Sequence, residues 1–288
     1  YKRQGRECDF VIGIGGGSPL DVAKGVALLI KNPTVEPFEL IYKTKGSDAI
    51  PVIAIPTTGG TGSETTPYAV YTDHKLETKT TMTQRVFPLY ALLDVRYYMY
   101  LPKAIRNSTC VDALTHSIES YMNTNATKYS DYTALESIRL WGEYKEALLL
   151  DDNDVDAMKA MMTSSTLAGM AISQTGTSIP HSMGYPLTYY HGLYHGVANA
   201  VFMASYLNLC SNKWKVATII ETLGFESVQS LGSFIEAIVG RITITDEEID
   251  RYSDLLMSNE RKLKNHPDPI TKDDVVRIYN ESVGANNE

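Results

Sequence analysis

The sequence has few cysteines, no long apolar run and no excess of basic residues. Its three cysteines, Cys8, Cys110 and Cys210, lie far apart and outside any CxxC motif, so we expect no disulfides and a reducing, cytoplasmic location. No apolar run could span a bilayer, and we expect neither a secretory leader nor a membrane partner. The formal net charge of −8 argues against a nucleic-acid partner, because a phosphate-binding surface needs clustered Lys and Arg.

The composition and the hydrophobic pattern indicate a globular chain with two regions. The 288 residues are 43% hydrophobic and 21% charged, which is ordinary for a globular protein with a sizeable core. Up to about residue 103, strand patterns alternate with helical ones, which predicts an α/β domain over residues 1–103. The strands that we expect there are 8–14, 50–56, 69–72 and 91–94. The first of them has the pattern of a buried strand.

From residue 104 to 288 the pattern predicts an all-helical domain without strands. Thr245 and Glu248 form a capping box that starts one of its helices. The other clear helical segments are 134–150, 157–173, 197–209 and 272–283.

A glycine-rich turn, Gly15-Gly16-Gly17-Ser18, follows the first expected strand. Ser18 suits the N-cap of the next helix, and Pro19 suits its first helical position. A strand, a glycine turn and a helix N-terminus can cradle a phosphate, because free backbone N–H groups point at the anion. Such a turn can equally serve packing alone.

A second loop, residues 57–66, contains nine Thr, Gly or Ser residues and follows the second expected strand. It offers hydroxyl groups, exposed N–H groups and close backbone approach to a ligand. The alternative is a flexible surface loop.

Two histidine clusters indicate a metal site. Asp112 and His116 are one helical turn apart, so a carboxylate and an imidazole on one helix face could share a divalent cation. The alternative is an acidic residue near a helix N-terminus and a packed core histidine. His181, His191 and His195 follow within fifteen residues, and Pro186 is expected to break their segment. One Asp with three or four His suits Fe²⁺ or Zn²⁺, leaving one of the three for a structural or proton-carrying role.

Four separated motifs resemble the iron-containing (group III) alcohol dehydrogenase family, in the order in which that family carries them. They are GGGSPLDVAK at 15–24, PTTGGTGSE at 56–64, VDALTHSIESY at 111–121 and PHSMGYPLTYYHGLYHGVANA at 180–200. The sequence is most similar to the propanediol- and butanol-dehydrogenase-like members. The resemblance implies a dehydroquinate synthase-like fold, with an incomplete α/β dinucleotide-binding domain followed by an all-α metal-binding domain.

The resemblance also implies the site residues. The family's metal ligands fall on Asp112, His116, His181 and His195, and the further catalytic candidates are Tyr185 and His191. Its cofactor contacts fall on Gly15, Gly16, Gly17, Ser18, Thr57, Thr58, Gly59, Gly60, Thr61, Thr66, Tyr68 and Lys79.

The activity implied is hydride exchange between NAD or NADP and a primary alcohol, diol or aldehyde, with Fe²⁺, or Zn²⁺ as isolated, in a cytoplasmic homodimer. A polyol dehydrogenase or a dehydroquinate-synthase-like enzyme is an alternative, although both relatives use a different ligand set.

Two departures from the family pattern matter. Relatives usually carry a further N-terminal segment of the nucleotide domain, so we expect these 288 residues to bind metal but to bind NAD(P) poorly. A metal-binding fragment without cofactor affinity is therefore a further alternative. Many relatives also have a histidine where Tyr185 stands, which leaves the proton relay open.

Overall fold

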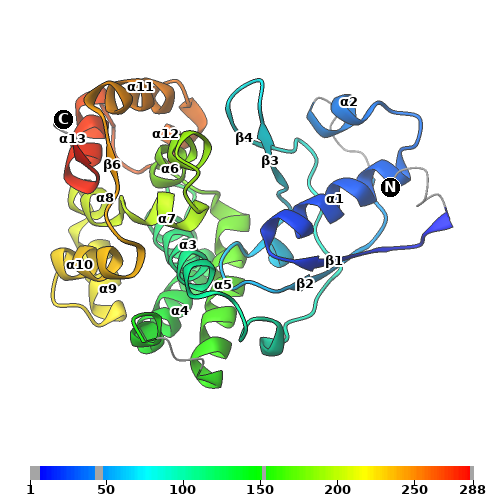
Figure 1. The fold of residues 1–288 in the computed structure, drawn as a ribbon, viewed down its shortest axis with the longest axis horizontal. Helices are drawn as coiled ribbons and strands as arrows, with labels where there is room; N and C mark the ends of the chain where they lie inside the picture. Colours follow the sequence, from blue (N-terminus) through cyan, green and yellow to red (C-terminus); the bar gives the residue numbers. More distant parts are fainter. Residues whose placement is uncertain (1–6, 43–47, 151–153, 286–288) are drawn as a thin grey trace.

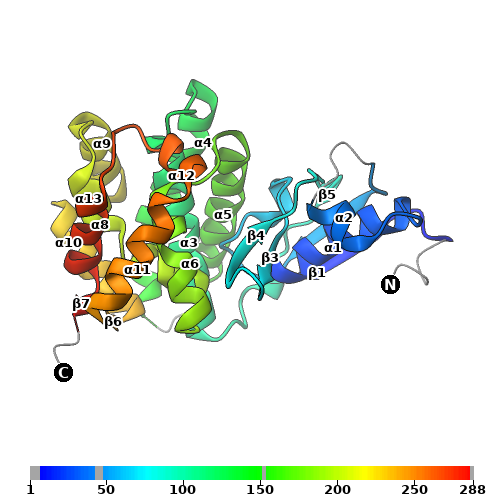
Figure 2. The ribbon, with the colours of Figure 1, turned by 90° about the horizontal axis from the view of Figure 1, so that it is seen from above.

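The computed structural model describes residues 7–42, 48–150 and 154–285. A small α/β part and a larger helical part lie side by side along the long axis of the molecule (Figures 1 and 2). The strands of the three-stranded sheet all precede residue 103, and the long helices follow it. The chain therefore has the α/β-then-helical order that the sequence predicts.

The α/β part is built on one βαβ unit. Strand β1 (Val11–Gly15) leads into helix α1 (Gly17–Lys31), and strand β2 (Val52–Pro56) then pairs with β1 in parallel. Strand β5 (Tyr90–Ala91) pairs with the other edge of β2, which gives the order β1-β2-β5. Helix α1 packs on one face of this sheet through Ala27 and Leu28, and the short helix α2 (Pro37–Tyr42) follows it.

The expectation of a buried first strand is half wrong. Gly13 faces α1 and is buried, whereas Ile12 and Ile14 are 50% and 58% exposed. Tyr90 of β5, on the far side of β2 in the same sheet, is 60% exposed. The reason is that α1 covers only one face of the sheet, and no other described element covers the opposite face of β1.

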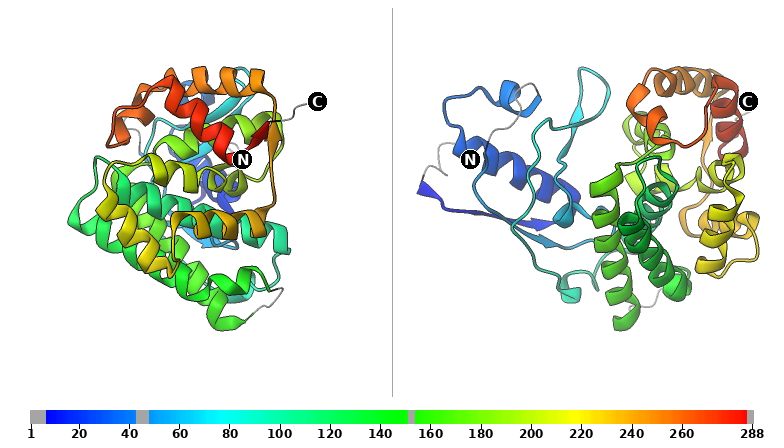
Figure 3. Two further views of the ribbon diagram at one scale, coloured as in Figure 1. Left: turned by 90° about the vertical axis from the view of Figure 1, so that its left-hand side faces the viewer. Right: turned by 180° about the vertical axis from the view of Figure 1, so that it is seen from behind.

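A β-hairpin lies between the two parts of the molecule. Strands β3 (Val70–Asp73) and β4 (Thr78–Thr81) pair antiparallel, with Thr72 opposite Lys79. Sequence analysis missed β4 because its Thr-Lys-Thr-Thr sequence has no apolar alternation. Figure 3 shows the hairpin beside the helical part, and its Glu77 accepts a hydrogen bond from the Tyr190 hydroxyl at 2.9 Å.

The helical part carries most of the core. Its α-helices are α3 (Lys103–Met122), α4 (Lys128–Tyr144), α5 (Val155–Thr175), α6 (Ile179–Tyr190), α7 (His195–Ala200), α8 (Met203–Leu209), α9 (Lys213–Leu223), α10 (Val228–Val239), α11 (Asp246–Met257), α12 (Glu260–Asn265) and α13 (Lys272–Ser282). Short 3-10 turns are η2 (Ser63–Thr65), η3 (Val95–Tyr97) and η4 (Lys145–Leu148). No helix of the described residues is both long and apolar enough to cross a membrane.

Three predictions for this part need correction. The expected helix 197–209 is two helices, α7 and α8, separated by a turn at Val201 and Phe202. Strands β6 (Thr243–Ile244) and β7 (Gly284–Ala285) form a two-residue parallel bridge where no strand was expected. Pro186 does not break its segment but lies inside α6, where packing against α7 compensates for the one backbone bond that it removes. The capping box of Thr245 and Glu248 is confirmed at the start of α11.

Helix α3 is the centre of the helical part. From Arg106 onward it is buried on nearly every side, because α4, α5 and α7 surround it. Its Leu114 and Ile118 are completely buried beside Trp141 of α4, whose indole N–H donates to the Cys110 carbonyl at 2.9 Å. Asp112 and His116 therefore project from a rigid, enclosed helix and not from a surface.

Candidate active site

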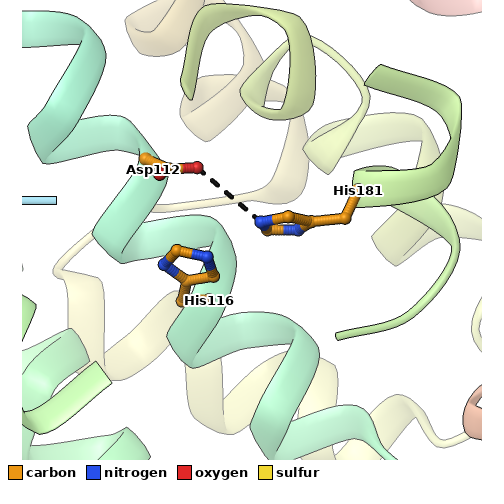
Figure 4. Close-up of side chains that lie close together, drawn as sticks. All are labelled: Asp112, His116 and His181. Carbon is orange, nitrogen blue, oxygen red and sulfur yellow. Dashed lines mark ion pairs between the residues drawn. The ribbon is translucent and has the colours of Figure 1, made fainter. Parts of the chain in front are cut away.

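Three potential metal ligands from α3 and α6 lie close together inside the helical part, namely Asp112, His116 and His181. One ligand atom of each lies within 4.8 Å of the others, and all three residues are buried. Figure 4 shows Asp112 and His116 on successive turns of α3, with the His181 ring entering from α6. His181 Nε2 lies 3.7 Å from an Asp112 oxygen, and the His116 and His181 ring centroids are 4.5 Å apart.

His195 is the first residue of α7 and borders this group. Its ring centroid is 5.4 Å from that of His181. The Asn199 amide, one turn later, donates to Asp112 at 3.1 Å and lies 3.2 Å from His195 Nε2. Gly196 permits this arrangement, because a Cβ there would lie 1.9 Å from the Ser108 carbonyl of α3.

The two histidines of the triad use their Nδ1 atoms elsewhere. His116 Nδ1 lies 3.2 Å from the Gly60 carbonyl, and His181 Nδ1 contacts the carboxylate of Glu119 on α3. The Nε2 atoms of both rings therefore remain available to bind a metal between Asp112, His116 and His181. Glu119 and Asn199 were not among the predicted site residues, although each stands within one helical turn of a predicted ligand.

The electrostatics favour a metal-binding protonation state. Burial lowers the pKa of both His181 and His195, so each ring is neutral near pH 7 and has a lone pair. Burial opposes ionisation of Asp112, but the three neighbouring histidines outweigh it and hold the Asp112 pKa below its ordinary value. Asp112 therefore supplies an anion, and His181 and His195 supply neutral imidazoles.

The residues fit a divalent transition metal. Among the described residues, His181 Nε2 and His195 Nδ1 are buried without a hydrogen-bond partner. Buried polar atoms in this state call for a partner, and carboxylate with imidazole suits Fe²⁺ or Zn²⁺.

A cavity of about 270 Å³ joins this group to the α/β part. Asp112, His116, His181, His195 and Tyr185 line it on the helical side. Six of the twelve predicted cofactor positions line it on the other side, namely Gly17, Ser18, Thr61, Thr66, Tyr68 and Lys79. The other six, Gly15, Gly16, Thr57, Thr58, Gly59 and Gly60, lie outside its lining.

The glycine turn differs from its prediction in one detail. Helix α1 begins at Gly17, and its N-cap is Gly16, without a side-chain cap, so Ser18 is not the N-cap. Gly15 adopts φ +145°, which lets the chain turn directly from β1 into the helix. A Cβ on Gly17 would lie 2.8 Å from the Thr61 side chain, so the turn and the second loop are in close contact.

A buried network that sequence analysis missed fixes the second loop against α1. The Lys24 ammonium donates to Ser63 Oγ at 2.7 Å and to the Tyr68 carbonyl at 2.5 Å. Asp21 accepts from Ser63 Oγ and from the Val70 N–H at 2.7 and 2.8 Å. Residues 57–66 are therefore not a free surface loop.

The two further catalytic candidates lie apart. Tyr185 stacks on His195 beside the cavity, and burial raises its pKa to about 12. His191 ends α6 as its C-cap and pairs with Glu248 of α11 at 3.2 Å, and it does not line the cavity.

Two sequence families match the chain. The Fe-containing alcohol dehydrogenase family, C-terminal, matches residues 107–283, and iron-containing alcohol dehydrogenase matches residues 2–95. The chain belongs to the iron-containing alcohol dehydrogenase family.

Individual relatives within the family include an NAD-dependent methanol dehydrogenase from Bacillus methanolicus, 33% identical over 78% of this chain and 60% of that protein. A 1,3-propanediol dehydrogenase from Klebsiella pneumoniae is 31% identical over 85% of this chain and 64% of that protein. The chain thus spans about three fifths of the length of these relatives.

Solved structures of the family share the fold. An iron-containing alcohol dehydrogenase from Thermotoga maritima is 35% identical with a TM-score of 0.88, over 99% of this chain and 78% of that chain. A sulfoacetaldehyde reductase from Bifidobacterium kashiwanohense, in complex with NAD⁺, is 26% identical with a TM-score of 0.87, over 99% and 79%.

Proposed function

We propose that this protein is a metal-dependent oxidoreductase that moves hydride between NAD(P) and a primary alcohol, diol or aldehyde. One observation carries the proposal: a single cavity is lined by the Asp–His group on one side and by the N-terminus of α1 on the other. A redox cofactor bound at the helix N-terminus and a substrate held at the metal would then meet inside that cavity.

The proposed metal ligands are Asp112, His116, His181 and His195. When bound, Fe²⁺ or Zn²⁺ would polarise the oxygen of an alcohol or carbonyl, and the nicotinamide would carry the hydride. Asn199 orients Asp112, and the Gly60 carbonyl orients His116, so both side chains are held in position before a metal arrives.

The cofactor contacts that we propose are the six predicted positions that line the cavity. Gly17 and Ser18 provide free N–H groups at the start of α1, which suits an anionic pyrophosphate. Thr61, Thr66, Tyr68 and Lys79 would bind the rest of the molecule. The other six predicted positions lie outside the cavity lining, and the Gly60 carbonyl contacts His116 instead.

Tyr185 is the proposed proton donor and acceptor at the substrate oxygen. It lines the cavity next to His195, and its raised pKa keeps the hydroxyl protonated at neutral pH, so Oη can donate to a developing alkoxide. His191 is not proposed for this role, because it lies against α11.

The substrate class is inferred from chemistry and from relatives together. The relatives include a methanol dehydrogenase, a 1,3-propanediol dehydrogenase and a sulfoacetaldehyde reductase. The first is NAD-dependent, and the third is in complex with NAD⁺. We propose a short primary alcohol or diol and its aldehyde, with NAD as the first cofactor to test. A homodimer is proposed on the family resemblance, and a cytoplasmic location on that resemblance together with the three widely separated cysteines.

The test combines metal analysis, calorimetric titration of NAD and NADP, and an activity screen. The chain would be loaded with Fe²⁺ or Zn²⁺ and assayed in both directions on short alcohols, diols and aldehydes. Turnover that requires the metal supports the proposal. A metal-loaded chain that binds neither cofactor favours the alternative of a metal-binding fragment.

A further inference from the structure

Glu119 is a buried carboxylate that faces the metal-site histidines. It stands three residues after His116 on α3 and is completely buried. One of its oxygens contacts His181 Nδ1, and the other accepts the Ser178 N–H from the segment before α6. Both oxygens are therefore contacted from the α6 side.

These contacts determine which nitrogen of His181 carries the proton. In its ionised form Glu119 only accepts hydrogen bonds, so Nδ1 of His181 is then the donor and Nε2 holds the lone pair. Burial raises the pKa of Glu119, and the Lys262 charge and the Ser178 N–H oppose that rise and favour the carboxylate. Among the described residues, Nε2 has no hydrogen-bond partner, and it points at Asp112 from 3.7 Å. We propose that Glu119 is a positioning residue that fixes His181 as its Nδ1–H tautomer and aims Nε2 at a divalent metal held with Asp112 and His116. This inference rests on the proposed function.

Helix α12 supplies the charge that a buried carboxylate needs. The Lys262 ammonium donates to Thr177 Oγ1, next to Ser178, and its electrostatic partner is Glu119. Lys262 also lies 5.9 Å from the centre of the Tyr185 ring. The buried Glu119 carboxylate thus has polar or charged partners both on α12 and at the start of α6. A residue that only packed within α3 would not need these partners.

The direct test is Glu119→Gln in the full chain, with Zn²⁺ affinity measured by chelator competition. Gln can accept from His181 only by turning its amide N–H₂ towards the Ser178 N–H, so the ring loses its fixed orientation. We expect Zn²⁺ binding to weaken about 10- to 100-fold, as for other groups that orient metal ligands. Unchanged affinity in a folded Glu119→Gln chain would overturn the inference.

Glu64→Gln is the matched control. Glu64 is also a buried carboxylate that accepts one side-chain hydrogen bond, from Thr166 at 2.9 Å, but it does not line the cavity. Its replacement should leave Zn²⁺ affinity unchanged. An equal loss in both variants would assign the effect to general destabilisation and would overturn the inference.

Two measurements remain valid if Glu119→Gln folds poorly. In the Zn²⁺-loaded parent chain, ¹⁵N-labelled histidine spectra should show His181 as the Nδ1–H tautomer, assigned with His181→Ala. An Nε2–H tautomer would contradict the inference directly. In Co²⁺-loaded protein, Glu119→Asp should change the visible absorption bands, because the shorter side chain cannot hold the ring in place, and unchanged bands count against the inference.

The same experiments separate this inference from the proposed function. A parent chain that binds neither Zn²⁺ nor Co²⁺ defeats the proposed metal site itself. A parent chain that binds both, with a variant that binds equally well, defeats only the role of Glu119.

Discussion

The ring of Tyr185 lies nearly parallel to the ring of His195, with centroids 5.8 Å apart and 18° between the planes. This stacking assigns Tyr185 two separable contributions. Its ring supports a proposed metal ligand, and its hydroxyl is available to the cavity as a hydrogen-bond donor. Substitutions can remove one contribution without the other.

We predict that Tyr185→Phe keeps the metal but lowers kcat about 100-fold, because the ring still stacks on His195 while the proton donor is lost. Tyr185→Ala should weaken metal binding as well. The measurements are metal content and steady-state kinetics of both variants. Full activity in Tyr185→Phe would show that the proton travels by another route.

The second prediction separates the histidines. His195→Ala should weaken Zn²⁺ binding by more than about 100-fold, since losing a ligand costs more than losing a group that orients one. His191→Ala should retain the metal, because His191 pairs with Glu248 away from the cavity. Chelator competition measures both, and loss of metal from the His191 variant would contradict the assignment.

A third prediction concerns the glycine turn. Gly17→Val should raise the Kd for NAD at least about tenfold, equivalent to about 1.4 kcal/mol. The reason is that the added side chain would collide with Thr61 and occupy space at the lining of the cavity. Metal content should not change. The control is Val22→Ala, an exposed position on the same helix. If Gly17→Val lowers metal content and NAD affinity together, the turn is structural.

The fourth prediction is a pH dependence of stability. Burial lowers the pKa of His266 to about 4, and Asp268, 3.9 Å from its ring, only partly opposes this. The unfolded chain, with the ordinary value near 6.5, binds more protons between pH 4 and 6.5. Stability is therefore intact above pH 6.5 and is lost as the pH falls towards 4.

His266→Phe should remove this dependence. From pH 7 to pH 5, the parent chain should lose about 2 kcal/mol of unfolding free energy more than the variant does. Urea unfolding at both pH values measures the difference. Equal losses in the two proteins would show that His266 does not titrate in this range.

Local patterns in the sequence predicted the elements better than the contacts between them. The Thr245–Glu248 capping box acts within one helical turn, and it starts α11 where expected. Ser18 was assigned as an N-cap by residue type, yet the helix starts earlier, because Gly15 turns the chain sharply enough for Gly17 to be helical. Residue preference identified Ser18 as a good N-cap residue, but the backbone geometry at Gly15 determines where the helix begins.

Contacts across the chain were beyond reach of pattern reasoning. Glu119 meets Ser178 and His181, which lie about sixty residues away, and nothing in the local sequence of either segment indicates the other. The exposed face of β1 was missed for a related reason. The apolar run that includes Ile12 and Ile14 was interpreted as a buried strand, whereas burial depends on whether another element lies over that face.

Because α3 is surrounded by other helices, it affects how a metal ion could enter or leave the proposed site. A helix packed on nearly every side exposes its amide groups only when the surrounding bundle opens, so its amide protons should be among the slowest of the chain to exchange with deuterium. Asp112 and His116 belong to that slow unit. A metal would then enter and leave through the cavity and not through local opening of α3.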